Sequence, residues 1–339
     1  MQNANRKRYL LLSAATFFAT IASGVLALAQ TTTPMPDWQK TAGGKQEFEV
    51  ASVREDKVGG SAYSNFSLDA GNEYFVPSKS DILDPTGTLF SARNQPLLRY
   101  IVFAYKLNGT QELALRFDFY AGLGLHVPLW VRQTQYDIEA RAPGEATKDQ
   151  MRLMMQDLLS DRFKLAVHWE AREAPVFGLV LETPGKLGPQ LLQHPAGNNC
   201  EATAFPDDAG RAPAKEQHAA TNLSTLPIPC GVIAHLTASA SGGHRFGGRN
   251  VPLALLADSL PTQTGMATLP RPVVDQTGLA GKFDFWLDWT PEDTSEVNNG
   301  ETGGTFREAL KKQLGLKLVP ERAPVEVLVI DHVEQPSPN

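Results

Sequence analysis

Apolar residues recur at the spacing of an α-helix in residues 97–105 and 151–163. In the second stretch they share one helix face: Met151, Met154, Met155, Leu158 and Leu159. Thr147 and Gln150 stand just before that stretch at the spacing of a capping box, in which two side chains bond the free backbone N–H groups of a helix start. We therefore predict a helix over each stretch.

Around these helices the pattern changes to a period of two. Apolar and polar residues alternate over 136–142, which predicts a strand. Two more strands, over 165–172 and 176–182, are predicted after the second helix, with a turn at Pro175 between them. A further strand ends at Asn94, a residue type that caps helices, so we expect Asn94 to cap the first helix.

The same order of features occurs a second time. Three groups of residues match: Phe90, Arg93, Asn94, Pro96 and Leu97 with Phe246, Arg249, Asn250, Pro252 and Leu253; Tyr136, Asp137 and Ile138 with Phe283, Asp284 and Phe285; Ala174, Pro175 and Val176 with Ala323, Pro324 and Val325. The second copy predicts helices over 253–260 and 306–314 and strands over 283–289, 316–321 and 325–333, with a turn at Pro324. Three matches in one order indicate an internal duplication.

Each copy has the order β-α-β-α-β-β, and its helices have one apolar face. Such elements form small sheets with helices packed on one side, so we predict an α+β fold built twice. The first unit spans 46–183, with an extra leading strand over 48–54, and the second spans 244–339. Residues 184–243 between them are rich in Gly and Pro and form a predicted connector.

The N-terminus has the pattern of an export signal. Basic residues at 6–8 precede an apolar run over 9–29, which ends in Ala27-Leu28-Ala29, the small-x-small pattern that signal peptidase accepts. We predict a signal peptide over 1–29, a flexible leader over 30–45, and a location in the periplasm or outside the cell. The alternative is an uncleaved membrane anchor, since about twenty apolar residues can span a bilayer. No later stretch is apolar enough to cross a membrane.

The charge balance excludes two classes of partner. The chain has 31 Lys and Arg against 37 Asp and Glu. Loss of the predicted signal peptide removes three basic residues and leaves 28 against 37. A chain this acidic, without a basic run, is a poor candidate for binding nucleic acid or anionic membranes.

The two cysteines, Cys200 and Cys230, both follow the predicted signal. In an oxidising compartment an even pair indicates a disulfide, and closing a loop of about thirty residues is worth roughly 3–4 kcal/mol. A zinc site with His194 and His235 is an alternative, although the spacing fits no zinc-ribbon pattern. Free thiols are the third possibility, and we favour the disulfide.

Local motifs of catalysis, nucleotide binding or metal binding are absent from the sequence, and we predict no cofactor and no metal. His168 and Glu170 lie on one face of a predicted strand, where they are weak candidates for an acid/base pair. Ordinary cross-strand contacts are the alternative. We interpret Asp284 and Asp288, on a shared strand face, as solvated polar positions.

Three residues of the second unit are weak candidates for binding. The stretch 242–249 is glycine-rich and basic, so its backbone N–H groups could hold an anion, although a turn into a strand, with Arg249 paired to an acidic neighbour, is the alternative. Trp286 and Trp289 face opposite sides of their predicted strand. One of them can therefore be exposed in a binding patch, while core packing is the default for both.

Several segments carry a family resemblance: Phe48-Glu-Val-Ala-Ser-Val-Arg54, Tyr136-Asp-Ile-Glu-Ala, residues 151–170, Pro175-Val-Phe-Gly-Leu, residues 274–284 and residues 323–331. Together they resemble secreted proteins, abundant in soil acidobacteria, whose domain has no known function. The resemblance covers nearly the whole mature chain. It implies an exported location, gives no catalytic residue to carry over, and hints at envelope sensing, because some relatives occur beside or fused to membrane metallopeptidases of the antibiotic-sensing type.

The second copy also resembles a small periplasmic module. Residues 250–256, 263–265 and 305–318 are similar to the module at the N-termini of secretins and TonB-dependent receptors, although the segment between Trp289 and Thr305 is longer here. That module mediates protein–protein contact and signalling.

These observations favour a non-enzymatic binding or adaptor protein of the cell envelope or extracellular space, with an envelope or extracellular protein as the expected partner. The alternative is a secreted hydrolase whose active site lies between the units, where His168, Glu170 and the stretch 242–249 meet.

Overall fold

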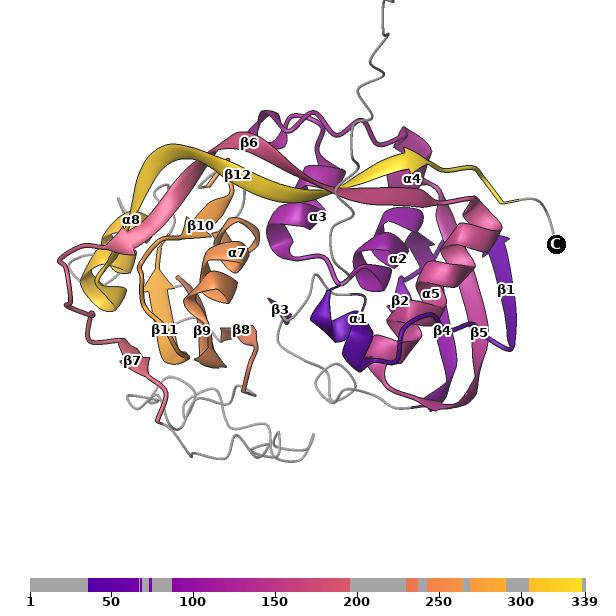
Figure 1. The fold of residues 1–339 in the computed structure, drawn as a ribbon, viewed down its shortest axis with the longest axis horizontal. Helices are drawn as coiled ribbons and strands as arrows, with labels where there is room; N and C mark the ends of the chain where they lie inside the picture. Colours follow the sequence, from indigo (N-terminus) through magenta and orange to yellow (C-terminus); the bar gives the residue numbers. More distant parts are fainter. Residues whose placement is uncertain are drawn as a thin grey trace, which may run out of the picture. The chain divides into compact units, whose positions relative to one another are not determined.

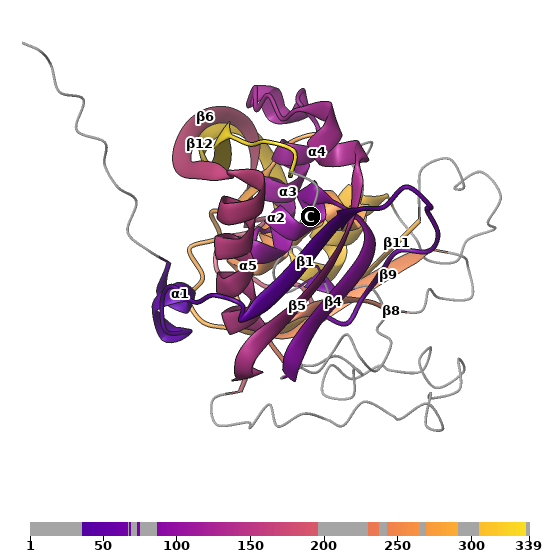
Figure 2. The same cartoon turned by 90° about the vertical axis from the view of Figure 1, so that its right-hand side faces the viewer.

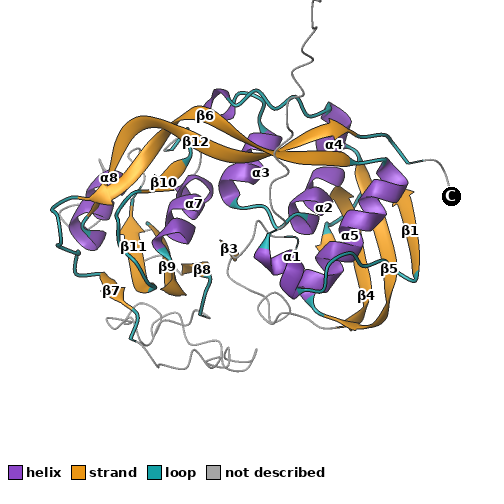
Figure 3. Cartoon of the chain, viewed as in Figure 1, coloured by secondary structure: helices purple, strands orange, loops and turns teal. Residues whose placement is uncertain are grey.

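The structure is a computed structural model that describes residues 36–66, 68, 73–74, 87–195, 230–236, 243–264, 269–290 and 305–336. Residues 35–339 form one unit, which contains three small sheets and the helices that pack against them (Figure 3). This arrangement confirms the predicted α+β class. The predicted signal peptide lies outside the described residues, within which no helix has the length and apolar character needed to span a membrane.

The first half of this unit is built on a sheet of order β1-β5-β4-β2. Helix α5 lies across one face of that sheet, with β1 at the sheet's outer edge (Figure 2). The elements are α1 (Asp37–Thr41), β1 (Val50–Glu55), β2 (Tyr63–Ser64), β4 (Gly87–Pro96), α2 (Leu97–Ala104), α3 (Gly109–Arg116), the short helix η1 (Tyr120–Gly122), α4 (Leu129–Gln133), β5 (Gln135–Ala146) and α5 (Lys148–Phe163).

The second half is built on a sheet of order β3-β8-β9-β11-β7 (Figure 1). Its elements are β3 (Glu73–Tyr74), β7 (Leu191–Gln193), β8 (Ile233–Leu236), β9 (His244–Val251), α7 (Leu253–Thr264), β10 (Val273–Asp275), β11 (Phe283–Trp289), α8 (Phe306–Ala309) and η4 (Leu310–Leu314). Strands β7 and β8 fall within the predicted connector 184–243. Because β7 pairs with β11 as β1 pairs with β5, the second copy also has a leading strand.

The capping box of α5 forms as the sequence predicts. The hydroxyl of Thr147 accepts from the Gln150 amide at 3.3 Å, and the Gln150 side chain accepts from the Thr147 amide at 2.8 Å. In the second copy the hydroxyl of Thr305 accepts from the Glu308 amide at 3.5 Å. These local signals locate both helix starts because they need no distant partner.

Asn94 does not cap α2, contrary to the prediction, since the helix begins at Leu97 with Pro96 before it. Asn94 and its counterpart Asn250 instead adopt left-handed backbone conformations, with φ of 50° and 54°. Asn tolerates this conformation better than most residues. The amide of Asn94 donates to Asp137 at 2.9 Å, and that of Asn250 donates to Asp284 at 2.8 Å. The two copies predicted from the sequence therefore share this turn.

The turns predicted at Pro175 and Pro324 are wrong. β6 (Ala166–Leu181) and β12 (Leu316–His332) each run straight through their proline and pair with each other as a long antiparallel ribbon. Only two strands are present at the prolines, so the missing N–H can face outward without loss of a ladder bond. Ala174 lies directly opposite Ala323, its equivalent in the duplication.

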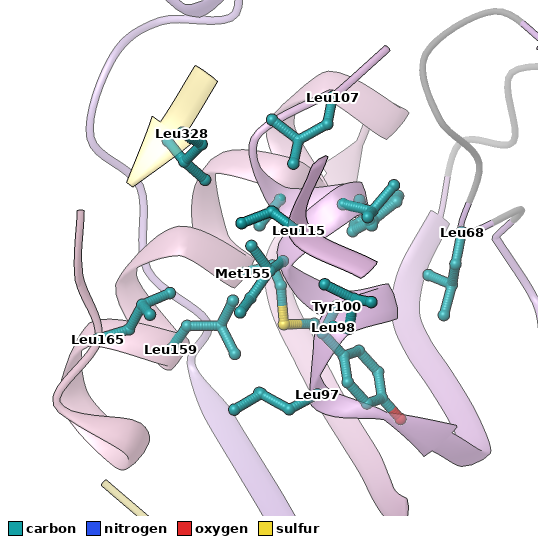
Figure 4. Close-up of a cluster of buried hydrophobic side chains, with 14 of the residues drawn as sticks. Leu68, Leu97, Leu98, Tyr100, Leu107, Leu115, Met155, Leu159, Leu165 and Leu328 are labelled. Carbon is teal, nitrogen blue, oxygen red and sulfur yellow. The ribbon is translucent and has the colours of Figure 1, made fainter. Parts of the chain in front are cut away.

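The two ends of this ribbon belong to different cores (Figure 1). Val327 and Leu328 of β12 are buried in the first half, although they come from the end of the chain. Figure 4 shows Leu328 in one cluster of buried side chains with Leu159 and Leu165 of the first half. Conversely, Leu179 of β6 is buried in the core of the second half. Each copy therefore gives a strand to the other copy.

Helices α3 and α7 form a second contact between the halves. The Asn108 side chain caps α3 by accepting from the Gln111 amide at 2.9 Å, and its proximity lowers the pKa of Asp258 of α7 slightly. Burial is the main cause that raises the pKa of Asp258 to about 7, and the negative charge of Asp275 adds to it. An acidic group with a strongly raised pKa therefore lies where the two copies meet.

Candidate functional site

An open groove of about 730 Å³ lies between β1 and the C-terminal end of α5. One wall is formed by Lys45, Glu47, Phe48, Glu49, Val50 and Ala51, and the other by Asp157, Leu158, Ser160, Asp161, Arg162 and Lys164. Five consecutive residues, 47–51, line the groove. Successive side chains of a strand point to opposite faces, so the groove follows the backbone edge of β1 rather than one face of the sheet.

Strand β1 ends its sheet and pairs only with β5 among the described strands, although Val53 on its outer side has a further interaction. The amide of Asp56 donates to the carbonyl of Gln135 at 2.9 Å, so the even-numbered residues of β1 are the ones that bond to β5. The backbone N–H and C=O of Ala51 consequently point away from β5, toward the groove.

The opposite wall is the last turns of α5. The helix ends at Lys164, which has a left-handed backbone with φ of 52°. The amide of Leu165 donates a hydrogen bond to the Leu159 carbonyl at 3.2 Å, which caps the C-terminal end of the helix. Ser160 is exposed on this wall, whereas Leu158 is 6% exposed and belongs to the core. The helix therefore presents a rigid wall with an apolar base.

Apolar side chains lie under a charged rim. Phe48 packs against the buried Phe90, with ring centroids 6.4 Å apart, and Val50 is 61% exposed. On the rim, the ammonium of Lys45 lies 2.9 Å from Glu47 and 3.1 Å from Asp157. The hydrogen bond to Glu47 is the main cause that raises the pKa of Lys45. Exposed ion pairs of this kind add little stability.

His168 and Glu170 lie on β6, outside the residues that line the groove. His168 Nδ1 is 2.8 Å from Asp331 Oδ1, and its Nε2 is 3.8 Å from Glu170. The guanidinium of Arg172, 2.9 Å from Glu170, is the main cause that lowers the pKa of that carboxyl. Glu170 therefore stays ionised at neutral pH and cannot serve there as a general acid.

The candidate residues of the second half lie apart from the groove. Trp289 is 4% exposed and packs edge-on against Phe246, with centroids 5.4 Å apart. Trp286 is half-buried. The glycine-rich stretch is largely strand β9, where the Arg249 carbonyl accepts from the Gly231 amide at 2.7 Å.

Asp284 is not a solvated position, contrary to our interpretation. Asp284 is 7% exposed, and its Oδ1 lies 2.7 Å from His194 Nδ1. The same oxygen accepts the hydrogen bond from the Asn250 amide. Asp288 is half-buried and pairs with Arg245. Both aspartates therefore have structural partners, which the pattern of the strand alone does not reveal.

The backbone of Cys230 forms an isolated β-bridge with that of Arg249. Cys200 lies outside the described residues, so the disulfide stays a prediction. The described residues contain no cluster of three or more His, Cys, Asp or Glu side chains arranged to hold a metal ion. The zinc alternative involves His194, whose Nδ1 faces Asp284 in the structure.

Fold and site together define an α+β protein with two cores joined by the ribbon of β6 and β12, and its described groove lies beside β1. The chain belongs to a family described as a protein of unknown function (DUF3738), which matches residues 99–333. The helix wall of the groove lies inside the matched region, and the β1 wall precedes it. No curated protein and no solved structure matches the chain.

Proposed function

We propose that this chain is an exported binding protein of the cell envelope or extracellular space, and that it holds another protein in the groove between β1 and α5. The observation that carries the proposal is the groove itself, which joins an apolar base to the backbone of Ala51 at the end of the sheet. Proteins commonly recognise extended polypeptides at such edges. The similarity of the second copy to a periplasmic interaction module supports the same class of function.

Capture of a partner through the groove tests this proposal. The bait is residues 30–339, exposed to native envelope and culture fractions. Ser160→Trp places a large side chain on the groove wall without touching the core, because Ser160 is exposed. We expect this variant to capture about tenfold less partner than the wild type does, because a blocked groove removes most of the contact area.

The matched control is Lys312→Trp. Lys312 is also exposed, with 75% of its side chain accessible, and it lies on the corresponding helix end of the second half. The control should capture as much partner as the wild type. Equal capture by the Ser160→Trp variant, or no capture by the folded wild type, would count against the proposed binding function.

Export is the second part of the proposal, and it is supported by the basic and apolar pattern at the N-terminus and by the pair of cysteines. We expect the protein recovered from the periplasm or the medium to begin at Gln30, as intact-mass measurement will show. Alkylation before and after reduction, measured in the same way, checks the proposed disulfide between Cys200 and Cys230. Recovery of a membrane-bound protein that begins at Met1 would instead support the uncleaved anchor.

A further inference from the structure

Phe177 lies in the part of β6 that belongs to the second half, and it is 7% exposed. Strand β10 pairs with β6 at this point, and the amide of Phe177 donates to the Pro272 carbonyl at 2.8 Å. The residue before Pro272 is Arg271, whose guanidinium carbon lies 5.5 Å from the centroid of the Phe177 ring. The pairing of the two strands therefore holds one arginine over this ring.

A second arginine reaches the same ring from helix α8. The guanidinium carbon of Arg307 lies 5.0 Å from the Phe177 centroid. The helix is anchored beside Arg307, because Phe306 is buried and packs edge-on against Trp289, with ring centroids 5.7 Å apart. Two segments that are distant along the chain therefore bring a positive charge to one aromatic side chain.

The two guanidinium groups lack a carboxylate partner. Within the residues that the structure describes, neither of them forms an ion pair or a hydrogen bond. The acidic residue next to Arg307 is Glu308, which pairs with Lys312 at 3.7 Å. The one that follows Arg271 on β10 is Asp275, which accepts from the Thr277 amide at 2.9 Å. The neighbouring acidic side chains are thus engaged elsewhere.

The positive charges of this pair lie close together. The guanidinium carbons are at most 10.5 Å apart, since one lies 5.0 Å and the other 5.5 Å from the same centroid. Like charges repel at this distance, and more strongly beside a protein surface than in bulk water. Attraction to the ring offsets part of the repulsion. A bound anion would offset more of it, so the pair favours an anionic ligand.

The chemistry of the pair also indicates which anion it fits. A guanidinium binds an aromatic ring without using its hydrogen bonds, so its N–H groups remain able to donate a bidentate pair to an oxyanion. A carboxylate carries one negative charge and balances one arginine, whereas a phosphate group carries about 1.5–2 at neutral pH and balances both. Arg307 is exposed and Arg271 is half-buried, so a ligand reaches them from solvent.

We propose that Arg271 and Arg307, held over Phe177, form a binding site for a phosphate group, either as the free anion or as part of a phosphorylated molecule. These three residues belong to the second half and are not among those that line the groove between β1 and α5. The site therefore gives the protein a ligand in addition to the proposed protein partner, and it does not depend on that partner.

Calorimetric titration of residues 30–339 with inorganic phosphate, at constant ionic strength, tests the proposal. We expect saturable binding of one phosphate per chain. Arg307→Gln should weaken it at least about tenfold, because the variant loses a charge and a bidentate donor. Arg307→Lys keeps the charge without the planar fork and should weaken it less. Arg307 is exposed, so both variants should fold as the wild type does.

The matched control is Arg322→Gln, which lowers the net charge by the same amount. Arg322 is an exposed arginine of β12, and its guanidinium donates to the Glu173 carbonyl at 3.1 Å. Its loss should leave the affinity for phosphate unchanged. Acetate, which carries a single charge, should bind at least about tenfold more weakly than phosphate.

A titration with O-phosphoserine distinguishes the two sources of the phosphate group. Tighter binding of phosphoserine than of inorganic phosphate would support a phosphorylated molecule as the ligand, and equal or weaker binding would support the free anion. Three results would overturn the site: no saturable binding of either probe, wild-type affinity in the Arg307→Gln variant, or an equal loss in the Arg322→Gln variant. Partner capture through the groove is measured independently, so the two sites are tested separately.

Discussion

Removal of residues 324–339 is expected to unfold the first half of the molecule, which is built mostly from the other end of the sequence. The deletion takes three buried side chains from that core: Val325, Val327 and Leu328. Each buried aliphatic side chain contributes roughly 1.5–3 kcal/mol. Their joint loss is comparable to the whole stability of a typical domain, about 5–15 kcal/mol. Hydrogen exchange of α2 and α5 measures the effect.

A single substitution makes the same test in a milder form. Leu328→Ala should cost about 2–5 kcal/mol in the free energy of unfolding, because Leu328 is 1% exposed in the first core. Glu326→Ala, two residues earlier on the same strand, is the control, since Glu326 is exposed and its change should cost less than about 0.5 kcal/mol. If the amides of α2 and α5 in the deletion variant are protected from hydrogen exchange as in the wild type, β12 does not stabilise the first core.

Asp258→Asn is expected to stabilise the protein at pH 8 and to have little effect at pH 4. The pKa of Asp258 is raised from 3.8 to about 7 in the folded chain. Between these values the folded state holds a proton that the unfolded state has released, so stability falls as pH rises from about 4 to 7. A pKa difference of that size is worth on the order of 4 kcal/mol.

Denaturant unfolding at several pH values measures this effect. The wild type should lose stability toward pH 8, and the Asp258→Asn variant should lose much less, because asparagine carries no charge to bury. Asp161→Asn is the control, since the side chain of Asp161 is 67% exposed and the variant should follow the wild type. A variant at position 258 with the wild-type pH profile would show that Asp258 is not the group responsible.

The sequence patterns predict the helices and the duplication but not the pairing of the long strands. The capping box at Thr147 is a local signal, and α5 begins where it predicts. Pro175 and Pro324 are also local signals, but they mislead, because a proline in a two-stranded ribbon loses no ladder bond. Whether β12 folds back on its own copy or crosses to the other depends on contacts more than a hundred residues apart along the chain.

The candidate groove was not predictable for a related reason. Its walls come from residues 45–51 and 157–164, and neither segment has an unusual composition. The prediction of a leading strand over 48–54 comes close to β1, at Val50–Glu55. However, no pattern in the strand reveals that it ends its sheet among the described strands. The residues with more conspicuous chemistry, His168 and Trp289, lie elsewhere.

Strand exchange also sets the order of events during synthesis. A growing chain contains the sheet and helices of its first half long before β12 emerges, and Val327 and Leu328 are missing from that core until then. The first half therefore completes its folding only after β12 has emerged, and the long sequence separation of these contacts makes the final step slow. Until then the nascent first half exposes the apolar surface that β12 later covers, which makes the newly made chain a substrate for chaperones.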